Sequence, residues 1–96
     1  MSSLDEILGK LRQHGDELSR RGALRLAVFG SFARGEATAD SDLDLLVELD
    51  ERTFDRYMDL KLYLEDLFAR RVDLVLADRI KPGLRARILS QAVDAA

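Results

Sequence analysis

Two aspartates separated by one residue, Asp42 and Asp44, are the side chains of this sequence best suited to chemistry. They stand at the start of a strand-like apolar run, residues 43–49. Because strand side chains alternate between the two faces of a sheet, both carboxylates are expected on one face and the apolar side chains on the other. Neighbouring carboxylates repel each other unless a cation lies between them, and Mg²⁺ binds one or two carboxylates together with substrate phosphates. The pair therefore predicts a magnesium site.

A candidate phosphate site precedes the aspartates. Gly30 and Ser31 follow a strand-like run, residues 24–29, and begin a short helical segment. Free backbone N–H groups at the start of a helix bind anions, and the Ser31 hydroxyl adds a donor. Arg34 is close enough in the chain to assist, although its alternative role is an ion pair with a neighbouring carboxylate. Together with the aspartates, these residues outline a nucleotidyl-transfer site.

Asp73 is a third acidic residue, within the apolar run of residues 71–76. An ionised carboxylate buried in a strand without a partner is costly, and binding a metal ion would remove that cost. The structural alternative is that the glycine, the serine and the first aspartate are ordinary loop and capping residues. Asp44 argues against it, because it interrupts apolar residues within a strand. A site that binds a nucleotide without reacting is a further alternative.

Composition narrows the class of protein. The 96 residues, 47% of them hydrophobic and 34% charged, fit a single domain, residues 1–96. Without cysteine the chain can form no disulfide or thiolate zinc site, and one histidine, His14, cannot form a histidine metal site. No apolar run approaches the roughly 20 residues of a membrane span, and the acidic start lacks the basic residues of a signal peptide. We therefore expect a cytoplasmic protein without a membrane partner.

Charge is distributed unevenly along the chain, whose formal net charge is −3. Residues 36–66 contain eleven Asp and Glu against three Lys and Arg, whereas residues 70–90 contain six Lys and Arg against two Asp. An acidic protein is a poor general ligand for nucleic acid, so no direct nucleic-acid binding is expected. The basic segment could bind a triphosphate or an acidic partner surface. Its alternative role is a solvated, ion-paired helix face.

Apolar periodicity and capping residues predict the elements that position these side chains. Ser3 and Glu6 form a capping-box pattern before the first helix, and Pro82 suits the first turn of the last. Leu84 and Leu89 are expected on the buried face of that last helix. The alternation predicts a two-layer α/β domain, with carboxylates on one sheet face and helices on the other. The predicted helices are residues 4–20, 32–34, 54–69 and 82–93, and the predicted strands are residues 24–29, 43–49 and 71–76.

The order and spacing of these motifs resemble a known family. Gly30-Ser31, ten residues, and then Asp42-Leu43-Asp44 look like the signature of the DNA polymerase β-like nucleotidyltransferase superfamily. The fuller segments GSFARGEA and SDLDLLVE resemble its smallest branch, the minimal nucleotidyltransferases (MNT). The later segments VDLVLAD and KPGLRARIL lie where that family has its third carboxylate and last helix, so the resemblance covers nearly the whole chain. It implies a short mixed β-sheet, which periodicity alone does not.

The resemblance also implies an activity. MNT proteins are known as antitoxins paired with HEPN-domain ribonuclease toxins, and the implied reaction transfers AMP from ATP to a tyrosine of the toxin. Many relatives have arginine or another polar residue where this chain has Phe32, which removes one possible phosphate contact. The residues that the resemblance assigns are Asp42, Asp44 and Asp73 for two Mg²⁺ ions, and Gly30, Ser31 and Arg34 for the phosphates.

The identity of the acceptor stays open from the sequence. Larger members of the superfamily use separate domains to hold their acceptors, and a chain of 96 residues has no room for one. The acceptor must bring its own recognition surface, which favours a protein. The alternative is a non-catalytic MNT-like module that neutralises a HEPN toxin by contact. A weaker alternative is transfer to a small-molecule or nucleic-acid hydroxyl within a multi-chain enzyme, and a homo-oligomer is also compatible with the sequence.

Overall fold

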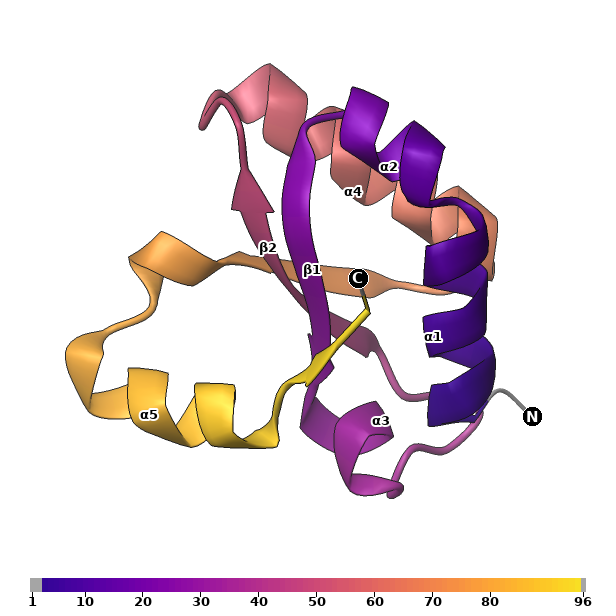
Figure 1. Ribbon diagram of the computed structural model, residues 1–96. Coiled ribbons are helices and arrows are strands. Elements are labelled where there is room, and N and C mark those ends of the chain that lie inside the picture. The colour runs from indigo at the N-terminus through magenta and orange to yellow at the C-terminus, as the bar shows by residue number, and fades with distance from the viewer. Residues whose placement is uncertain (1–2, 96) are drawn as a thin grey trace.

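Four strands form one mixed sheet in the computed structural model of the chain, which describes residues 3–95 (Figure 1). No helix among the described residues is both long and apolar enough to cross a lipid bilayer. The elements are α1 (Leu4–Gln13), α2 (Gly15–Arg20), β1 (Ala23–Phe29), α3 (Gly30–Arg34), β2 (Leu43–Leu49), α4 (Phe54–Phe68), β3 (Val72–Leu76), the 3₁₀ turn η1 (Ala77–Arg79), α5 (Pro82–Gln91) and β4 (Val93–Asp94).

Strand β2 lies inside the sheet, whose strand order is β3-β2-β1-β4. It runs antiparallel to β1, with Leu46 opposite Ala27, and parallel to β3, with Asp44 opposite Asp73. The short strand β4 runs antiparallel along the other side of β1. The parallel pair confirms the mixed sheet, and its register places the second aspartate of the first motif beside the third acidic residue.

One face of the sheet is covered by α1, α2 and α4. Their apolar side chains meet Leu43, Leu45 and Val47, which alternate along β2 with side chains of the other face. Leu45 and Leu60 are fully buried, and a leucine buried in this way contributes about 1.5–3 kcal/mol of hydrophobic free energy. This face holds the hydrophobic core, as the alternation in the sequence predicts.

The N-terminal helix is interrupted, although the periodicity predicts one helix over residues 4–20. α1 and α2 are separated at His14, which has φ −103° and ψ 20°. The ring Nδ1 of His14 lies 2.9 Å from the Lys10 carbonyl oxygen. Glycine is a poor helix former, so the break falls beside Gly15, where the helix is weakest. After the break, Leu18 still packs into the same core as α1.

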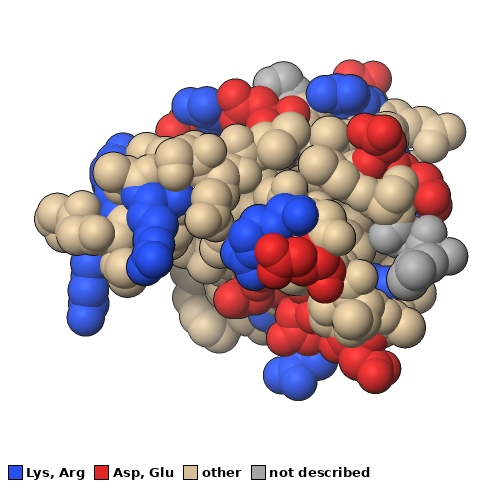
Figure 2. All heavy atoms as spheres, turned by 90° about the horizontal axis from the view of Figure 1, so that it is seen from below, with Lys and Arg blue, Asp and Glu red and all other residues tan. Residues whose placement is uncertain are grey.

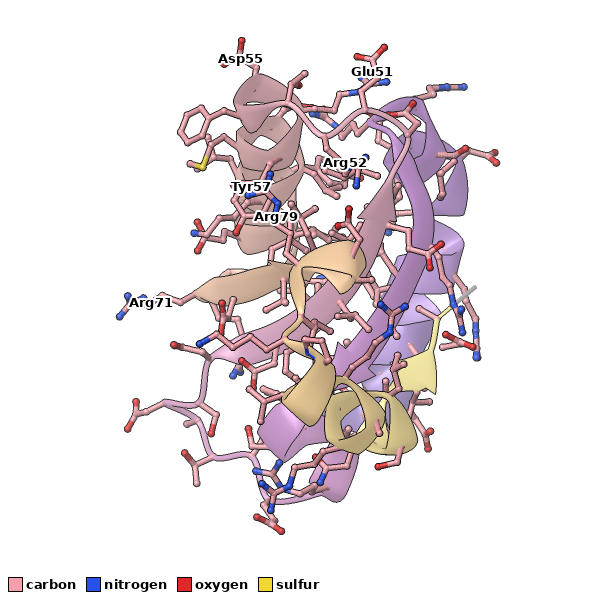
Figure 3. The ribbon with its side chains drawn as sticks, turned by 90° about the vertical axis from the view of Figure 1, so that its left-hand side faces the viewer. Glu51, Arg52, Asp55, Tyr57, Arg71 and Arg79 are labelled. Atoms are coloured by element: carbon pink, nitrogen blue, oxygen red, sulfur yellow. The ribbon has the colours of Figure 1, made fainter. Side chains whose placement is uncertain are left out.

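The C-terminal region differs most from the sequence-based prediction. α5 ends at Gln91, and Val93 pairs with β1 as part of β4 instead of extending the helix. Leu84 and Leu89 are 47% and 43% exposed, and no residue of α5 is buried. The predicted buried face of this helix is therefore wrong. α5 stands apart from α1, α2 and α4, on the other side of the sheet (Figures 1 and 3).

Strand β3 is an edge strand, and side chains of α4 cap part of its free edge. Glu65 accepts a hydrogen bond from the Val72 N–H at 3.0 Å, and the Tyr57 hydroxyl donates to the Leu74 carbonyl oxygen at 2.5 Å. Figure 3 shows Tyr57 on α4, close to β3. Covering an edge in this way hinders its pairing with another chain. The capped edge also holds β3 in place beside β2.

Candidate active site

The sheet face opposite the core carries its side chains in successive rows across the strands. The acidic row consists of Phe29 on β1, Asp44 on β2 and Asp73 on β3. The apolar row, two residues away along the strands, consists of Ala27, Leu46 and Val75. Because residues two apart on a strand point the same way, both rows face the same side. The acidic groups therefore lie at one end of this face, next to a smooth apolar strip.

Asp44 is the central group of the acidic row. It is half-buried, and no described residue donates a hydrogen bond to its carboxylate. Burial raises its pKa above the ordinary value, and the nearby charges of Asp73 and Asp42 raise it further, against a smaller opposing effect of Arg34. These carboxylates are thus close enough to interact, and a cation among them would relieve their repulsion.

Gly30 makes the closest approach to Asp44. It has φ +70°, a conformation that side-chain-bearing residues rarely adopt. A Cβ atom at this position would stand 2.8 Å from the Asp44 Cγ and 3.1 Å from its Cβ, closer than real Cβ atoms come to the carboxyl carbon. The sequence suggests that glycine is needed there for a phosphate to approach. The structure adds a second reason, which is that the Asp44 side chain occupies that space.

The other predicted phosphate ligands lie on the short helix α3. Ser31 is half-buried, and its hydroxyl forms no hydrogen bond with residues 3–95. Arg34 is exposed, and its guanidinium lies 3.4 Å from the Glu36 carboxylate and 3.4 Å from the Gln91 side-chain oxygen. Both contacts are long for charged hydrogen bonds. Arg34 therefore links α3 loosely to the end of α5, and an anion could compete for it.

Phe32 points away from the site. It is 3% exposed and belongs to the core, so the aromatic residue anchors α3 to the protein. The Arg70 guanidinium lies 4.9 Å from the ring centroid, and Arg70 also donates a hydrogen bond of 2.8 Å to the Ser41 carbonyl oxygen. Arg70 thus ties the residue before Asp42 to α3. No local pattern in the sequence indicates this contact, because the two partners are far from Arg70 in the chain.

The three predicted metal ligands are not equivalent. Asp44 and Asp73 are opposite each other in the parallel register, whereas Asp42 precedes β2 and is exposed, as is Asp73. Within residues 3–95, no three carboxylate, imidazole or thiolate groups are grouped closely enough to form a ready-made metal site. The structure therefore brings two of the aspartates together, and the third flanks them. Such a pair can bind a divalent cation whose remaining ligands come from a substrate.

The cationic side chains of α5 and the residue before it lie apart from carboxylates. Seen from below, the end where α5 lies displays Lys and Arg without adjacent Asp or Glu (Figure 2). These cations include Arg85 and Arg87 on α5 and Lys81 directly before it. None of the three forms an ion pair within residues 3–95. The alternative of a solvated, ion-paired helix face is therefore correct for α5 in the exposure of these side chains and wrong in their ion pairing. Its cations are free to meet an anionic ligand.

Comparison with known proteins agrees with these features. The nucleotidyltransferase domain family matches residues 7–95. Protein adenylyltransferase MntA of Thermococcus cleftensis is 41% identical over 95 residues, which are 97% of this chain and 96% of that protein. A solved structure provisionally named a minimal nucleotidyltransferase is 43% identical, with a TM-score of 0.82, and the match covers 96% of this chain and 95% of that one.

Two more distant solved structures share the fold. One is a toxin–antitoxin with AMP-PNP, with a TM-score of 0.72 and 20% identity over 88% of this chain and 72% of that one. The other is a tri-AMPylated Shewanella oneidensis HEPN toxin in complex with an MNT antitoxin, with a TM-score of 0.66 and 16% identity over 93% and 71%. The full-length matches at higher identity decide the family. The chain belongs to the nucleotidyltransferase domain family and, within it, to the minimal nucleotidyltransferases.

Proposed function

We propose that this protein is a protein adenylyltransferase that transfers AMP from ATP to a tyrosine of a HEPN ribonuclease toxin and thereby acts as its antitoxin. The observation that carries the proposal is the acidic row beside Gly30, in a chain that matches a protein adenylyltransferase over nearly its full length. Two solved complexes of the same fold support the choice of substrates, because one contains an AMPylated HEPN toxin as acceptor and the other contains AMP-PNP, an analogue of ATP.

The proposed reaction joins the tyrosine oxygen to the α-phosphorus of ATP. The bond between that phosphorus and the oxygen bridging to the β-phosphate breaks, and pyrophosphate leaves with the electron pair. The phenol proton passes to solvent. Reactions of this kind depend on positioning the reactants and neutralising charge on the phosphate oxygens. The protein groups that can do both lie along the acidic row and at the start of α3.

The donor chemistry of the acidic row fits a magnesium ion. Asp44 and Asp73 offer oxygen ligands side by side, and Asp44 lacks a hydrogen-bond donor among the described residues. Mg²⁺ binds through one or two carboxylates plus substrate phosphates, so a cage of three protein groups is not required. We assign Asp42, Asp44 and Asp73 as the residues that would hold one or two such ions. When bound, the metal would neutralise phosphate charge and lower the pKa of the attacking hydroxyl.

The start of α3 is the proposed place of the β- and γ-phosphates. Gly30 lies against Asp44, so a phosphate beside Gly30 and Ser31 is within reach of a metal ion on the aspartates. The Ser31 hydroxyl is uncommitted among the described residues. Arg34 would exchange its long contacts with Glu36 and Gln91 for a phosphate oxygen. These residues would bind and orient the triphosphate without taking part in bond making.

A binding module without chemistry is the second candidate. The observation that favours it is that residues 3–95 contain no preassembled group of three metal-binding side chains. Such a module would neutralise the toxin by occupying its surface. It would need the fold and the partner interface but not the carboxylates.

One experiment separates the two candidates. The protein is purified with a HEPN ribonuclease partner, ATP and Mg²⁺, and the partner is weighed by intact-mass spectrometry. Each AMP transferred should add about 329 Da to the partner, because covalent modification adds the mass of the transferred group. The charged adduct should also reduce RNA cleavage by the partner.

The matched control is the double variant Asp42→Asn and Asp44→Asn. It should bind the partner, because its fold is intact, and leave the mass of the partner unchanged. If wild type and double variant both abolish RNA cleavage without any change of mass, the adenylyltransferase proposal fails and the binding module stands.

A further inference from the structure

A groove lies between α5 and the sheet, next to the acidic row. Ala27 and Leu46 of the apolar row form its floor, and Ala77, Leu89 and Ala92 form its walls. Its cavity volume is about 90 Å³, and part of the groove is open to solvent. The inner side of α5 is therefore separated from the sheet by a hollow lined with small or apolar side chains.

The groove lies where the rest of a nucleotide would extend from the acidic row. Leu46 is two residues from Asp44 on the same face, a step of about 6.6 Å along the strand. Ala27 is related to Phe29 in the same way on the neighbouring strand. A triphosphate held at Asp44 can therefore direct its sugar and base either to solvent or along this face. Only the second course buries the base.

The lining suits a flat heteroaromatic ring. Small side chains on the floor and the wall leave room beside a buried apolar cluster, in which Ala27, Leu46 and Ala77 are 4%, 5% and 9% exposed. Burial of a ring against apolar groups is favourable. Four charged side chains, those of Arg25, Glu48, Arg85 and Asp94, also line the groove. Arg85 has no ion pair among the described residues, and Arg25 pairs with Asp94 at 2.9 Å one row beyond the floor, next to Glu48. These groups can meet the polar edge of a base.

We propose that this groove binds the nucleobase of the nucleotide substrate. The inference rests on the proposed function, because a nucleotide held at the acidic row is what brings a base to this place. It also explains why α5 is present although no residue of the helix is buried and the helix adds little to the core. In this assignment Leu89 and Ala92 cover the base, and the alanines at positions 27, 77 and 92 keep its place free.

The first test fills the groove. Ala92→Leu adds a larger side chain to the wall, and Ala86→Leu makes the same change on α5 at an exposed position that does not line the groove. Binding of ATP and of inorganic tripolyphosphate, each with Mg²⁺, is measured by calorimetry on wild type and both variants. Ala92→Leu should weaken ATP binding by about tenfold or more, the effect of a steric misfit in an apolar pocket. Tripolyphosphate binding should not change, and Ala86→Leu should alter neither ligand.

The second test needs no variant. In wild-type protein labelled at alanine methyl groups, ATP should shift the methyl signals of Ala27 and Ala92 through the ring current of the base. Tripolyphosphate should leave these two signals nearly unchanged, and the Ala86 methyl should not respond to either ligand. This measurement keeps the proposal testable even if Ala92→Leu folds poorly.

The outcomes distinguish this inference from the proposed function. If wild type binds ATP and tripolyphosphate equally, and the Ala27 and Ala92 methyl signals do not move with ATP, the base lies elsewhere while the phosphate site stands. If wild type binds neither ligand, the proposed function fails and the base site fails with it. If Ala92→Leu binds ATP as wild type does, the groove assignment is wrong.

Discussion

The two faces of the sheet come from the same strands and differ in what covers them. Along β2, Leu43, Leu45 and Val47 are buried beneath α1 and α4. The alternate residues Asp44 and Leu46 face the side where α5 stands. A strand can therefore give half of its side chains to stability and half to a site. Changes on one face should leave the property of the other largely intact.

The helices on the two faces of the sheet also differ in how deeply their side chains are buried. α4 buries Leu60 and Leu64 completely, whereas α5 buries none of its residues. α5 also carries cations such as Arg85 and Arg87 that form no ion pairs within residues 3–95. Helix α4 is therefore part of the core, whereas α5 leaves its side chains exposed. Four measurements test this contrast.

The largest effect is expected from a cavity on the core face. Leu45→Ala should lower the free energy of unfolding by about 2–5 kcal/mol, because the side chain is fully buried and its site cannot collapse freely. Leu84→Ala on α5 should cost less than about 1 kcal/mol, because that leucine is half exposed. Urea unfolding of the two variants makes the comparison. Similar losses would contradict the contrast between the packed core beneath α4 and the exposed helix α5.

The next effect is the stabilisation expected from ATP and Mg²⁺ at Asp44. With free ATP and Mg²⁺ at about 100 times the dissociation constant, wild type should gain about 2.7 kcal/mol of stability, since the ligand binds the folded state. Asp44→Asn should lose this gain. Asp66→Asn, a matched change at an exposed aspartate of α4, should keep it. Thermal unfolding with and without ligand measures each shift, and a full shift in Asp44→Asn would show that the aspartate does not hold the metal.

A smaller effect should come from the contact between Gly30 and Asp44. Gly30 and Gly35 have nearly the same positive φ, +70° and +73°, but a Cβ at Gly35 would meet nothing within 4 Å. Gly35→Ala should cost about 1–2 kcal/mol from conformation alone. Gly30→Ala should cost at least about 1 kcal/mol more, because the methyl group displaces the Asp44 carboxylate. Chemical unfolding decides this, and the excess cost should shrink in an Asp44→Ala background, where only the close contact with the Cβ of residue 44 remains.

The smallest effect is electrostatic. Because burial raises the pKa of Asp44 in the folded protein, its stabilising contribution is present below the ordinary aspartate pKa and is lost as pH rises through the folded value. At neutral pH, without ligand, Asp44→Asn should therefore be more stable than wild type, by less than about 1 kcal/mol. The difference should narrow as the pH is lowered from about 7 toward about 4.

Asp50 provides a control in which the Asp→Asn change should have the opposite effect on stability. Its hydrogen bond from Arg56 lowers the Asp50 pKa, so Asp50→Asn should destabilise the protein at neutral pH, and that loss should also shrink as pH falls. Unfolding curves measured at several pH values test both variants. An Asp44→Asn variant that is less stable than wild type at neutral pH would contradict a strained, unpartnered carboxylate.

Local sequence pattern was sufficient to predict which side of the strand faces the core and where several helices begin. Leucine and valine at alternate positions of residues 43–49 predict which side chains enter the core, because alternation is a property of the extended backbone itself. The Thr53 hydroxyl accepts a hydrogen bond from the Arg56 N–H at the start of α4, as a capping residue should. Pro82 begins α5 as expected. Each of these features depends on residues within about one turn of each other.

The one-turn helix α3 shows where local pattern fails. The sequence analysis assigns Gly30 to phosphate binding, but it does not reveal that Asp44, fourteen positions later, lies against it. Phe32 enters the core, and a segment of five residues is too short for periodicity to indicate which side faces inward.

The acidic residues, their same-face alternation along β2 and the family motifs can be identified from the sequence alone. Contacts between distant residues place Asp44 opposite Asp73, interrupt the N-terminal helix at His14, and leave a groove between α5 and the sheet. Such contacts also pair Val93 with β1, in a strand of two residues. Strand register and helix placement depend on contacts between residues distant in the chain. The free energies of these contacts cannot be inferred from a short stretch of neighbouring residues.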